Sequence, residues 1–571
     1  MNILLVGVNA KYIHSCLAVH SLSCYAKEQY GLDVQVAEYT INQQREFLLA
    51  EIWKAQPDLV GFSCYIWNMG VIRSLITELR LLMPHLEILL GGPEVSFDGA
   101  ALLDQLNVDY ILTGEGEESF SRLCMARLAG TSLEDVPGLI WREEGQVREN
   151  PVPAPLDLAK LPFIYQDFSR FANRILYYEA QRGCPFQCQY CLSSVEKGVR
   201  FQPLEKVQRE LLVFLENRVR QVKFVDRTFN ADPNFAMAIW KFLHEHDNGV
   251  TNFHFELAAE LLTEEMLDFL PQVRPGLFQF EIGVQSTYQP TLRAIRRGGR
   301  FELLTRKVRR LQQAGNIHLH LDLIAGLPEE DLARFRQSFD DVYRLSPDQF
   351  QLGFLKLLKG SGLRRDQEKF GLVARQEPPY EILYTKVLSY GDLLLLKDVE
   401  TLVDSLYNSC QFRQTLAWLI SLTDAPFDFY RGMAAYFRNR GAFGQSLSRV
   451  QLFDLVHDYG MTLGVAQEEL IWRLKFDFCS REKPRRLPDW MPSEFSSAFR
   501  EAEYAFFQGA SRRQDLLPEY DGLEPRQVGR MAHLEVFPFD PRTGFSEPTA
   551  FLFNYRRTDI LGNATTTVVK L

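Results

Sequence analysis

The sequence predicts an α/β protein in three parts: a doubly wound, Rossmann-like parallel sheet, a partial (β/α)6 barrel and a helix-rich C-terminal region. Strand patterns alternate with amphipathic helical patterns over residues 1–140 and again over 174–360, which is typical of parallel sheets. Beyond about residue 375, long helical patterns dominate, and a chain of 571 residues has room for three or four domains. We expect domains at 1–145, 173–370 and 371–571, with a linker at 146–172.

The first domain is predicted from short apolar runs that are each followed by a loop and a helix. In a parallel sheet, the loops after the strands lie at one edge and line the ligand crevice. These loops are residues 9–15, 63–67, 91–97 and 114–118. The strand patterns are 3–8, 33–39, 58–65, 86–94 and the start of 108–120, and the helical patterns are 17–30, 47–55, 71–83 and the end of 108–120.

Prolines 151, 153, 155 and 162 indicate an extended linker, because proline fixes φ and cannot donate a backbone hydrogen bond. Six strand–helix units follow, and this number favours a partial barrel over an open sheet. The strands are expected at 175–180, 221–226, 253–258, 277–284, 319–326 and 350–357. The helices are expected at 204–217, 234–247, 263–271, 288–295, 301–314 and 331–344.

The C-terminal region has helical patterns at 380–398, 411–423, 445–458 and 466–475, then a small strand-containing tail. Its aromatic runs at 427–437 and 551–555 are typical of a core. Cys410 and Cys479 are isolated, and we expect buried, inert thiols. The basic segment 481–486 is either solvated surface or a docking site for an acidic partner.

The composition limits the possible partners and locations of the chain. Its net charge is −10, so nucleic acid is not expected as a partner. No apolar run approaches the roughly 20 residues that span a bilayer, so no membrane span is expected. The start lacks the features of a signal peptide, and nine cysteines are too few and too scattered for a disulfide framework. We expect a cytoplasmic protein.

The residues most indicative of chemistry are three cysteines within eight positions, in the segment QRGCPFQCQYC at 181–191. Cys184, Cys188 and Cys191 follow the first predicted barrel strand with C-x3-C-x2-C spacing. Thiolates select iron–sulfur clusters or zinc, and a structural zinc needs a fourth close ligand. The alternatives are a zinc site or three unligated buried cysteines.

This loop resembles the signature of the radical S-adenosylmethionine superfamily. The resemblance implies that the three cysteines hold a [4Fe–4S] cluster whose open iron binds S-adenosylmethionine, which is then cleaved to a 5′-deoxyadenosyl radical. Later segments support the resemblance: 225–230, 283–286 and 321–330 resemble its further strand motifs. The implied contacts of S-adenosylmethionine are Tyr190, Asp226, Glu256, Gly283, Gln285, Ser286, Gly326 and Leu327. Asp226 and Glu256 could instead be ordinary carboxylates at strand ends.

The first domain resembles the cobalamin-binding domain that precedes many radical S-adenosylmethionine modules. The family's Asp-x-His-x-x-Gly motif is absent, so we expect cobalt without a protein imidazole below it, with His14 as the alternative ligand. The other alternative is a flavodoxin-like domain without cobalamin. The implied cobalamin contacts are Asn9, Ala10, Tyr12, His14, Ser63, Cys64, Tyr65, Gly91, Gly92, Pro93, Glu94, Gly114, Glu115, Gly116 and Glu117.

Together these resemblances imply a cobalamin-dependent radical S-adenosylmethionine enzyme, foremost a methyltransferase that acts on an unactivated carbon of a small molecule or peptide. The alternatives are a ring-closing or rearranging enzyme with the same cofactors, and a non-catalytic sensor. A reducing partner such as flavodoxin or ferredoxin is implied as well. The sequence assigns no catalytic residue beyond the cofactor contacts, and the C-terminal region resembles tails of unassigned function.

Overall fold

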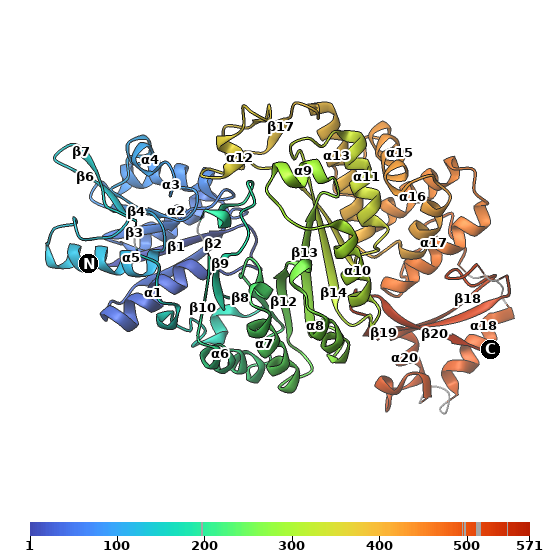
Figure 1. Cartoon of the computed structure of the whole chain (residues 1–571). Coiled ribbons are helices and arrows are strands. Elements are labelled where there is room, and N and C mark those ends of the chain that lie inside the picture. Colours follow the sequence, from blue (N-terminus) through green and yellow to red (C-terminus); the bar gives the residue numbers. More distant parts are fainter. Residues whose placement is uncertain are drawn as a thin grey trace.

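The structure is a computed structural model that describes residues 1–152, 154–195, 198–493, 495, 498–509, 515–544 and 546–570. Pro153 of the predicted linker lies outside the described residues. Figure 1 shows three parts in the order of the sequence, with the N-terminal sheet at one end, a strand barrel in the middle and helices at the other end. The three predicted parts are therefore present, while the exact boundaries at 145, 172 and 370 stay predictions.

The N-terminal part is a seven-stranded sheet with the order β2-β1-β3-β4-β5-β6-β7. Strands β1 to β5 are parallel, so the loops that follow them meet at one edge, as predicted. The strands are β1 Ile3–Asn9, β2 Gln35–Thr40, β3 Leu59–Ser63, β4 Glu87–Gly91 and β5 Tyr110–Leu112. The helices are α1 Leu17–Tyr30, α2 Arg45–Ala55, α3 Met69–Leu82, α4 Gly99–Leu106 and α5 Gly116–Ala129.

Three elements of this part were not predicted: helix α4 and the antiparallel strands β6 (Leu139–Glu143) and β7 (Gln146–Glu149). Strand β7 lies in the segment predicted as linker. Its residues are polar and mostly exposed, so their apolar pattern is too weak to indicate a strand. The hairpin extends the sheet, and Gly145 adopts the positive φ of 80° that its turn requires.

The middle part is a six-stranded parallel sheet with the order β15-β14-β13-β12-β11-β8. Strands that neighbour in sequence also neighbour in space, which is the order of a barrel and not of a doubly wound sheet. The partial barrel is thus confirmed. Its strands are β8 Leu176–Tyr178, β11 Gln221–Phe224, β12 Asn252–Leu257, β13 Phe278–Gln285, β14 His318–Ala325 and β15 Gln349–Phe354. Its helices are α6 Leu204–Glu216, α7 Pro233–Glu245, α8 Glu264–Phe269, α9 Gln289–Ala294, α10 Phe301–Gln312 and α11 Leu332–Tyr343.

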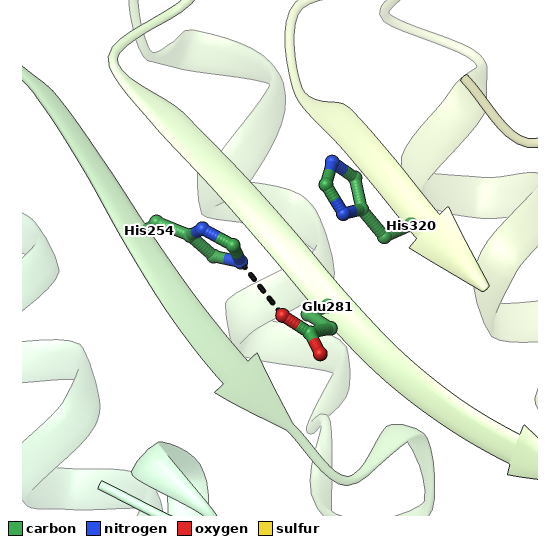
Figure 2. Close-up of side chains that lie close together, drawn as sticks. All are labelled: His254, Glu281 and His320. Carbon is green, nitrogen blue, oxygen red and sulfur yellow. Dashed lines mark ion pairs between the residues drawn. The ribbon is translucent and has the colours of Figure 1, made fainter. Parts of the chain in front are cut away.

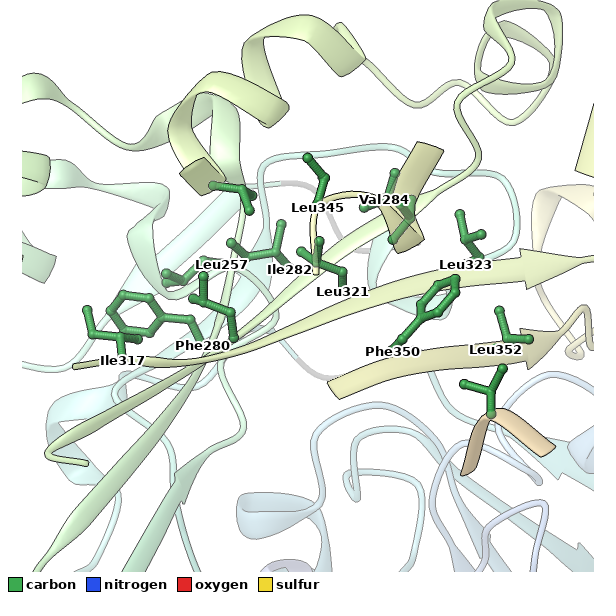
Figure 3. Packing of buried hydrophobic residues seen from close by; sticks show 14 of the residues in the cluster. Leu257, Phe280, Ile282, Val284, Ile317, Leu321, Leu323, Leu345, Phe350 and Leu352 are labelled. Carbon is green, nitrogen blue, oxygen red and sulfur yellow. The ribbon is translucent and has the colours of Figure 1, made fainter. Parts of the chain in front are cut away.

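Alternate residues of the barrel strands pack outward under the helices. Figure 3 shows this layer, in which Phe280 and Ile282 of β13 lie beside Leu321 and Leu323 of β14. Burial of such side chains contributes about 25 cal/mol per Å² of apolar surface. The inward residues of the same strands are polar, including Lys223, Glu281 and Asp322. The apolar packing that stabilises the barrel therefore lies between its strands and helices, and charged side chains line its interior.

The C-terminal part contains a helical bundle and a three-stranded antiparallel sheet. Its helices are α13 Tyr390–Leu402, α14 Arg413–Ser421, α15 Pro426–Asn439, α16 Arg449–Thr462, α17 Gln467–Arg481, α18 Ala498–Gln508 and α20 Pro525–Met531, and the short helix α12 (Gly362–Arg365) precedes them. The sheet consists of β18 Ala532–Phe537, β19 Thr549–Thr558 and β20 Ala564–Val569. Cys479 is buried, as expected, while Cys410 is only half-buried.

The predicted helix at 380–398 is wrong in its first half. Residues Ile382–Tyr384 form strand β17, which pairs with β16 (Val373–Ala374), and helix α13 begins only at Tyr390. The start is fixed by a capping box, in which the side chain of Ser389 accepts from the amide of Asp392 and the Asp392 carboxylate accepts in return. Helix α15, by contrast, was not predicted as a helix. Among the described residues, no helix combines the length and apolarity needed to cross a membrane.

Candidate functional site

The predicted cluster cysteines lie on a hairpin at the mouth of the barrel. Cys184 ends strand β9 (Gln181–Cys184), which pairs with β10 (Gly198–Phe201), and the backbone between Cys188 and Cys191 is closed by a 3.1 Å hydrogen bond. Gly183 has a φ of 103°, and a Cβ there would collide with the carbonyl oxygen of Gly198. Cys188 is buried, whereas Cys184 and Cys191 are half-buried. The loop therefore presents three thiols at a partly open surface.

The set of possible ligands separates the two metal alternatives. A structural zinc is closed by four protein ligands, usually cysteine or histidine. The segment 181–191 offers three thiols and no fourth cysteine, histidine or carboxylate, and the charged side chain that approaches Cys188 is the guanidinium of Arg297, which is not a metal ligand. Three thiolates in one loop therefore fit an iron–sulfur cluster better than a structural zinc.

Arg297 is a site residue that the sequence did not reveal. Its guanidinium lies 3.8 Å from the Sγ of Cys188 and 3.2 Å from the hydroxyl of Tyr190, and it also donates to the carbonyl of Gly283. Burial raises the pKa of the Cys188 thiol, and the nearby guanidinium partly offsets this. Arg297 thus connects the cysteine loop with strand β13. It stands in the run RRGGR, which by itself is typical of solvated surface.

The two carboxylates expected to contact S-adenosylmethionine lie in different surroundings. Asp226 is buried and accepts a 3.2 Å hydrogen bond from the amide of Ala180, while its second oxygen has no partner. Burial raises the pKa of Asp226 well above its usual range. Glu256 lies inside the barrel, where burial and the charge of Glu281 raise its pKa. Asp226 is thus bound to the backbone just before the cysteine hairpin, while Glu256 lies near Glu281 and Lys223 of the barrel interior.

The remaining predicted S-adenosylmethionine contacts lie at the ends of β13 and β14. Gln285 has a φ of 69°, and the carbonyl oxygen of its side chain is buried without a partner. Ser286 is already occupied, because its hydroxyl donates to Glu330 over 2.7 Å. Gly326 approaches Ile382 so closely that a Cβ would lie 2.7 Å from its side chain, and the neighbouring Leu327 is fully buried. A hollow beside Gly283 and Ser286 is lined by Arg297 and Arg300.

The barrel interior contains a network of histidines and charges below this level. Figure 2 shows His254, Glu281 and His320, whose ligand atoms lie within 4.8 Å of one another. Lys223 lies 3.0 Å from the carboxylate of Glu281, and His254 lies 3.2 Å from it. Burial raises the pKa of Glu281, but His254 and Lys223 outweigh this and bring the pKa to about 2. Because an ammonium already neutralises the carboxylate, we interpret the group as an ion-pair network and not as a metal site.

The loop after β1 joins the first domain to the barrel edge. The Nδ1 of His14 lies 2.7 Å from the hydroxyl of Tyr177 on β8, and Ile175 donates to the carbonyl of Ile13 over 2.8 Å. Glu38 fixes the base of the loop, because it accepts from Asn9 and pairs with Arg174 over 2.9 Å. Ala10 is half-buried and Tyr12 is exposed. Of the predicted cobalamin contacts here, Asn9 and His14 therefore already have protein partners.

The loops after β3 and β4 are fitted closely to each other. Gly92 has a φ of 107°, and a Cβ there would lie 2.7 Å from the carbonyl oxygen of Cys64. Asn68, which the sequence analysis did not single out, donates to the carbonyl of Ser63 and accepts from the amide of Tyr65, both over 2.8 Å. Ser63 and Cys64 are buried, while Tyr65 and Gly91 are half-buried and Pro93 is exposed.

Glu94 and the loop after β5 also contact other parts of the chain. Buried Glu94 accepts from the hydroxyl of Tyr380 and lies 3.8 Å from Lys359. Gly114 adopts a φ of 77°, and Gly116 begins helix α5.

Between these glycines, Glu115 pairs with Arg200, and Glu117 lies 2.9 Å from Arg182. Arg182 and Arg200 belong to the hairpin that carries Cys184. The acidic loop therefore attaches the cysteine hairpin to the first domain.

Comparisons with known families agree with this division. Residues 3–124 match the family of B12 binding domains, and residues 178–342 match the radical SAM superfamily. Residues 368–551 match DUF4080, a family of proteins of unknown function. The chain thus carries a B12-binding domain and a radical SAM domain, followed by a domain whose role no comparison describes.

Individual relatives are distant. An uncharacterized methyltransferase of Pyrococcus horikoshii is 28% identical over 204 residues, which are 33% of this chain and 43% of that protein. The cobalamin-dependent radical SAM methyltransferase TokK of Streptomyces tokunonensis is 24% identical over 506 residues, 80% of this chain and 72% of TokK. The structure of the cobalamin-dependent S-adenosylmethionine radical enzyme OxsB superposes with a TM-score of 0.61 at 16% identity, covering 84% of this chain and 81% of OxsB. This last likeness concerns the fold alone.

Proposed function

We propose that this chain, in which a B12-binding domain precedes a radical SAM domain, is a cobalamin-dependent radical S-adenosylmethionine methyltransferase that acts on an unactivated carbon. The observation that carries the proposal is the convergence of two sets of loops. The loop after β5 contacts the cysteine hairpin through Glu117 and Arg182, and the loop after β1 contacts β8, the strand just before that hairpin, through His14 and Tyr177. Two cofactors held by these loops would face the same barrel opening.

When bound, the cluster and cobalamin supply reductive cleavage of S-adenosylmethionine and a transferable methyl group. In our proposal Cys184, Cys188 and Cys191 hold the cluster. The guanidinium of Arg297, next to Cys188 and Tyr190, binds the carboxylate of S-adenosylmethionine, because Arg binds carboxylates through paired hydrogen bonds. Glu256 faces the interior and is available for the ribose hydroxyls.

The loops of the first domain are proposed to hold cobalamin from one side. Their glycines let the backbone approach a large flat ring, and buried Ser63 offers a small hydroxyl. The hydrogen bond between His14 and Tyr177 supports the expectation that no protein imidazole ligates cobalt from below. We also propose a cytoplasmic location, because all nine cysteines are unpaired.

Anaerobic reconstitution tests the proposal. We expect about four irons per chain, a stoichiometric cobalamin and, after reduction with S-adenosylmethionine present, release of 5′-deoxyadenosine. Cys188→Ala should lose the cluster signal, while Cys410→Ala, which changes a cysteine in the helical bundle, should keep it.

Formation of S-adenosylhomocysteine together with a methylated compound supports methyl transfer. A modified compound with no added methyl would instead identify a cyclase or rearranging enzyme. A reconstituted cluster that never yields 5′-deoxyadenosine would leave the chain as a cofactor-binding sensor.

A further inference from the structure

One surface of the barrel has a charge opposite to that of the chain. Residues 293–310 contain eight basic residues and one acidic residue, a net charge of +7. Because the whole chain carries −10, the remainder carries −17. Such a concentration of one sign on an acidic protein creates a local positive potential, which attracts acidic partners over about one Debye length.

Most of these basic side chains are available to a partner. Among the described residues, no ion pair or hydrogen bond is formed by the side chains of the exposed residues Arg293, Arg296, Arg300, Arg306 and Arg309. We call these five the arginine surface. The other three are engaged: Arg310 pairs with Asp268, Arg297 lies at the cysteine loop, and buried Lys307 donates to the carbonyls of Glu260 and Leu262.

The arginine surface begins at the cysteine loop. The amide of Gln189, between Cys188 and Tyr190, donates to the carbonyl of Ile295 over 2.9 Å. Arg297, one residue beyond Arg296, lies 3.8 Å from the sulfur of Cys188. From there the chain continues into helix α10, which carries Arg306 and Arg309 and which Figure 1 shows on the outside of the barrel. A partner seated on the arginine surface would therefore touch the segment that contacts the cluster ligands.

The basic segment 481–486, which the sequence analysis considered as a docking site, is largely bound to other parts of the same chain. Arg481 donates to the carbonyl of Leu561 over 2.7 Å, and Lys483 donates to the carbonyl of Gly529. Glu482 pairs with Arg449 over 2.7 Å. Of its basic residues, only Arg485 and Arg486 are exposed and form no hydrogen bond or ion pair with the described residues. The two basic segments thus differ, because one is tied to neighbouring loops while the other faces solvent.

We propose that the arginine surface docks the acidic face of a small electron-carrier protein that reduces the cluster. This rests on the proposed function, because only an enzyme with that cluster needs the carrier. A two-electron-reduced flavoprotein would give one electron to the oxidised [4Fe–4S]2+ cluster, which becomes [4Fe–4S]1+, and the flavin would keep the other. A nucleic acid is the competing occupant. The charge of −17 on the rest of the chain and the contact with the cluster ligands favour the carrier.

The test compares two charge reversals with a matched control. Arg293→Glu/Arg296→Glu changes the end near the cluster, and Arg306→Glu/Arg309→Glu changes the far end on α10. Arg485→Glu/Arg486→Glu makes the same change of charge on exposed arginines of the other segment. For each holoprotein we would measure the dissociation constant for a purified acidic flavodoxin, and the anaerobic rate at which reduced flavodoxin transfers its electron.

Both reversals should raise the dissociation constant and slow the transfer at least about tenfold, because steering of this kind changes association rates by about 10 to 10³. The control should behave like the wild type, whose rate should fall as salt is added. Excess dithionite should reduce the cluster to the same extent in all proteins.

Unchanged flavodoxin binding in both reversals would overturn the docking proposal, as would an equal loss in the control. So would reversals that abolish binding of a short RNA and leave flavodoxin unaffected. A failure of the proposed function is distinguishable, because the dithionite-reduced wild type would then release no 5′-deoxyadenosine from S-adenosylmethionine while flavodoxin binding is still measured.

Discussion

At the scale of single residues, Glu330 makes the stability of the barrel depend on pH. Its carboxylate is buried and accepts 2.7 Å hydrogen bonds from Ser286 and Ser338. Burial raises its pKa to about 7, although the two serines oppose the rise. In the unfolded chain the group ionises near its usual pKa of about 4.5. The folded state therefore holds the proton more tightly, and ionisation costs stability as the pH rises through 7.

We predict that Glu330→Gln is more stable than the wild type at pH 8 and nearly equal to it at pH 4.5. The glutamine carbonyl can accept the same two hydrogen bonds without ionising. The gain at pH 8 is at most about 3.5 kcal/mol, from about 1.4 kcal/mol for each pH unit between the two pKa values. Thermal unfolding of the cluster-free protein at several pH values measures it. Glu329→Gln, at an exposed neighbour, should leave the pH dependence unchanged, and a parallel shift at every pH would refute the explanation.

In the proposed mechanism, Arg297 needs the planar shape of its guanidinium as well as its charge. Its guanidinium reaches Tyr190 and Gly283 at once. Lysine keeps the charge but not the planar fork, so Arg297→Lys should weaken S-adenosylmethionine binding roughly tenfold or more. Titration of the reconstituted protein measures the dissociation constant. Iron content should stay at the wild-type value, and Arg296→Lys, one residue away and exposed, should bind normally. Loss of iron in Arg297→Lys would show that the residue only supports the loop.

The role of a residue could be predicted where it depends on a short stretch of sequence. It could not be predicted where it depends on tertiary contacts. The spacing of Cys184, Cys188 and Cys191 is visible in the sequence and marks one loop. Nothing in RRGGR distinguishes Arg297 from Arg296, yet folding places one at a cysteine sulfur and the other in solvent. In the same way, Glu115 was expected to contact a cofactor but pairs with Arg200, which lies 85 residues away in the sequence.

At the scale of elements, the close packing of the loops after β3 and β4 depends on Gly92. Gly92 combines a φ of 107° with a contact to the backbone of Cys64, which cannot move aside as a side chain can. Gly92→Ala should therefore cost about 1–3 kcal/mol of unfolding free energy and weaken cobalamin binding.

Gly70 in helix α3 is the control, because nothing lies within 4 Å of its added Cβ. Gly70→Ala should be neutral or stabilising by up to about 1 kcal/mol. Denaturation of both variants, with cobalamin titration, measures the difference. Equal stabilities would show that the contact at Gly92 is not limiting.

Helices and strands could be predicted where apolar residues recur with a clear period in the sequence. Barrel strands such as β13 alternate buried and half-buried residues, and the sequence pattern placed all six of them. Hairpin β6–β7 was missed because exposed polar residues dominate its second strand. Helix α13 was predicted to begin too early, because the apolar residues Ile382 and Leu383 fit a helical period while their backbone pairs as a strand. Its true start depends on the cap at Ser389, a local signal that competes with that period.

At the scale of the whole molecule, the first domain is fastened to the barrel on both sides of its opening. The loop after β1 lies along β8, and Glu94 after β4 contacts Tyr380 and Lys359, which follow β15. The first domain thus spans the gap between the first and last barrel strands. The sequence predicted the two folds but not this arrangement, because each contact joins residues that are far apart in the chain.

The centre of this attachment is Arg182, and its removal should loosen the cysteine hairpin. Its guanidinium lies 3.4 Å from Glu115, 2.9 Å from Glu117 and 2.7 Å from Glu179. Arg182→Met leaves three partly buried carboxylates without their shared cation, a change that typically costs about 3–5 kcal/mol. We expect faster hydrogen exchange over residues 181–201 and a lower iron content after reconstitution.

Arg148→Met is the matched control, because Arg148 forms an exposed ion pair with Glu143 at 3.4 Å, and such pairs contribute about 0–1 kcal/mol. Hydrogen exchange of the two variants separates local from general effects. If Arg182→Met exchanged no faster than Arg148→Met, the acidic loop would not be what holds the hairpin. If exchange instead rose throughout the barrel, Arg182 would stabilise the fold as a whole. An increase confined to the hairpin and to helix α5 would mean that Arg182 holds the cysteine hairpin against the acidic loop, beside the pair of Arg200 with Glu115.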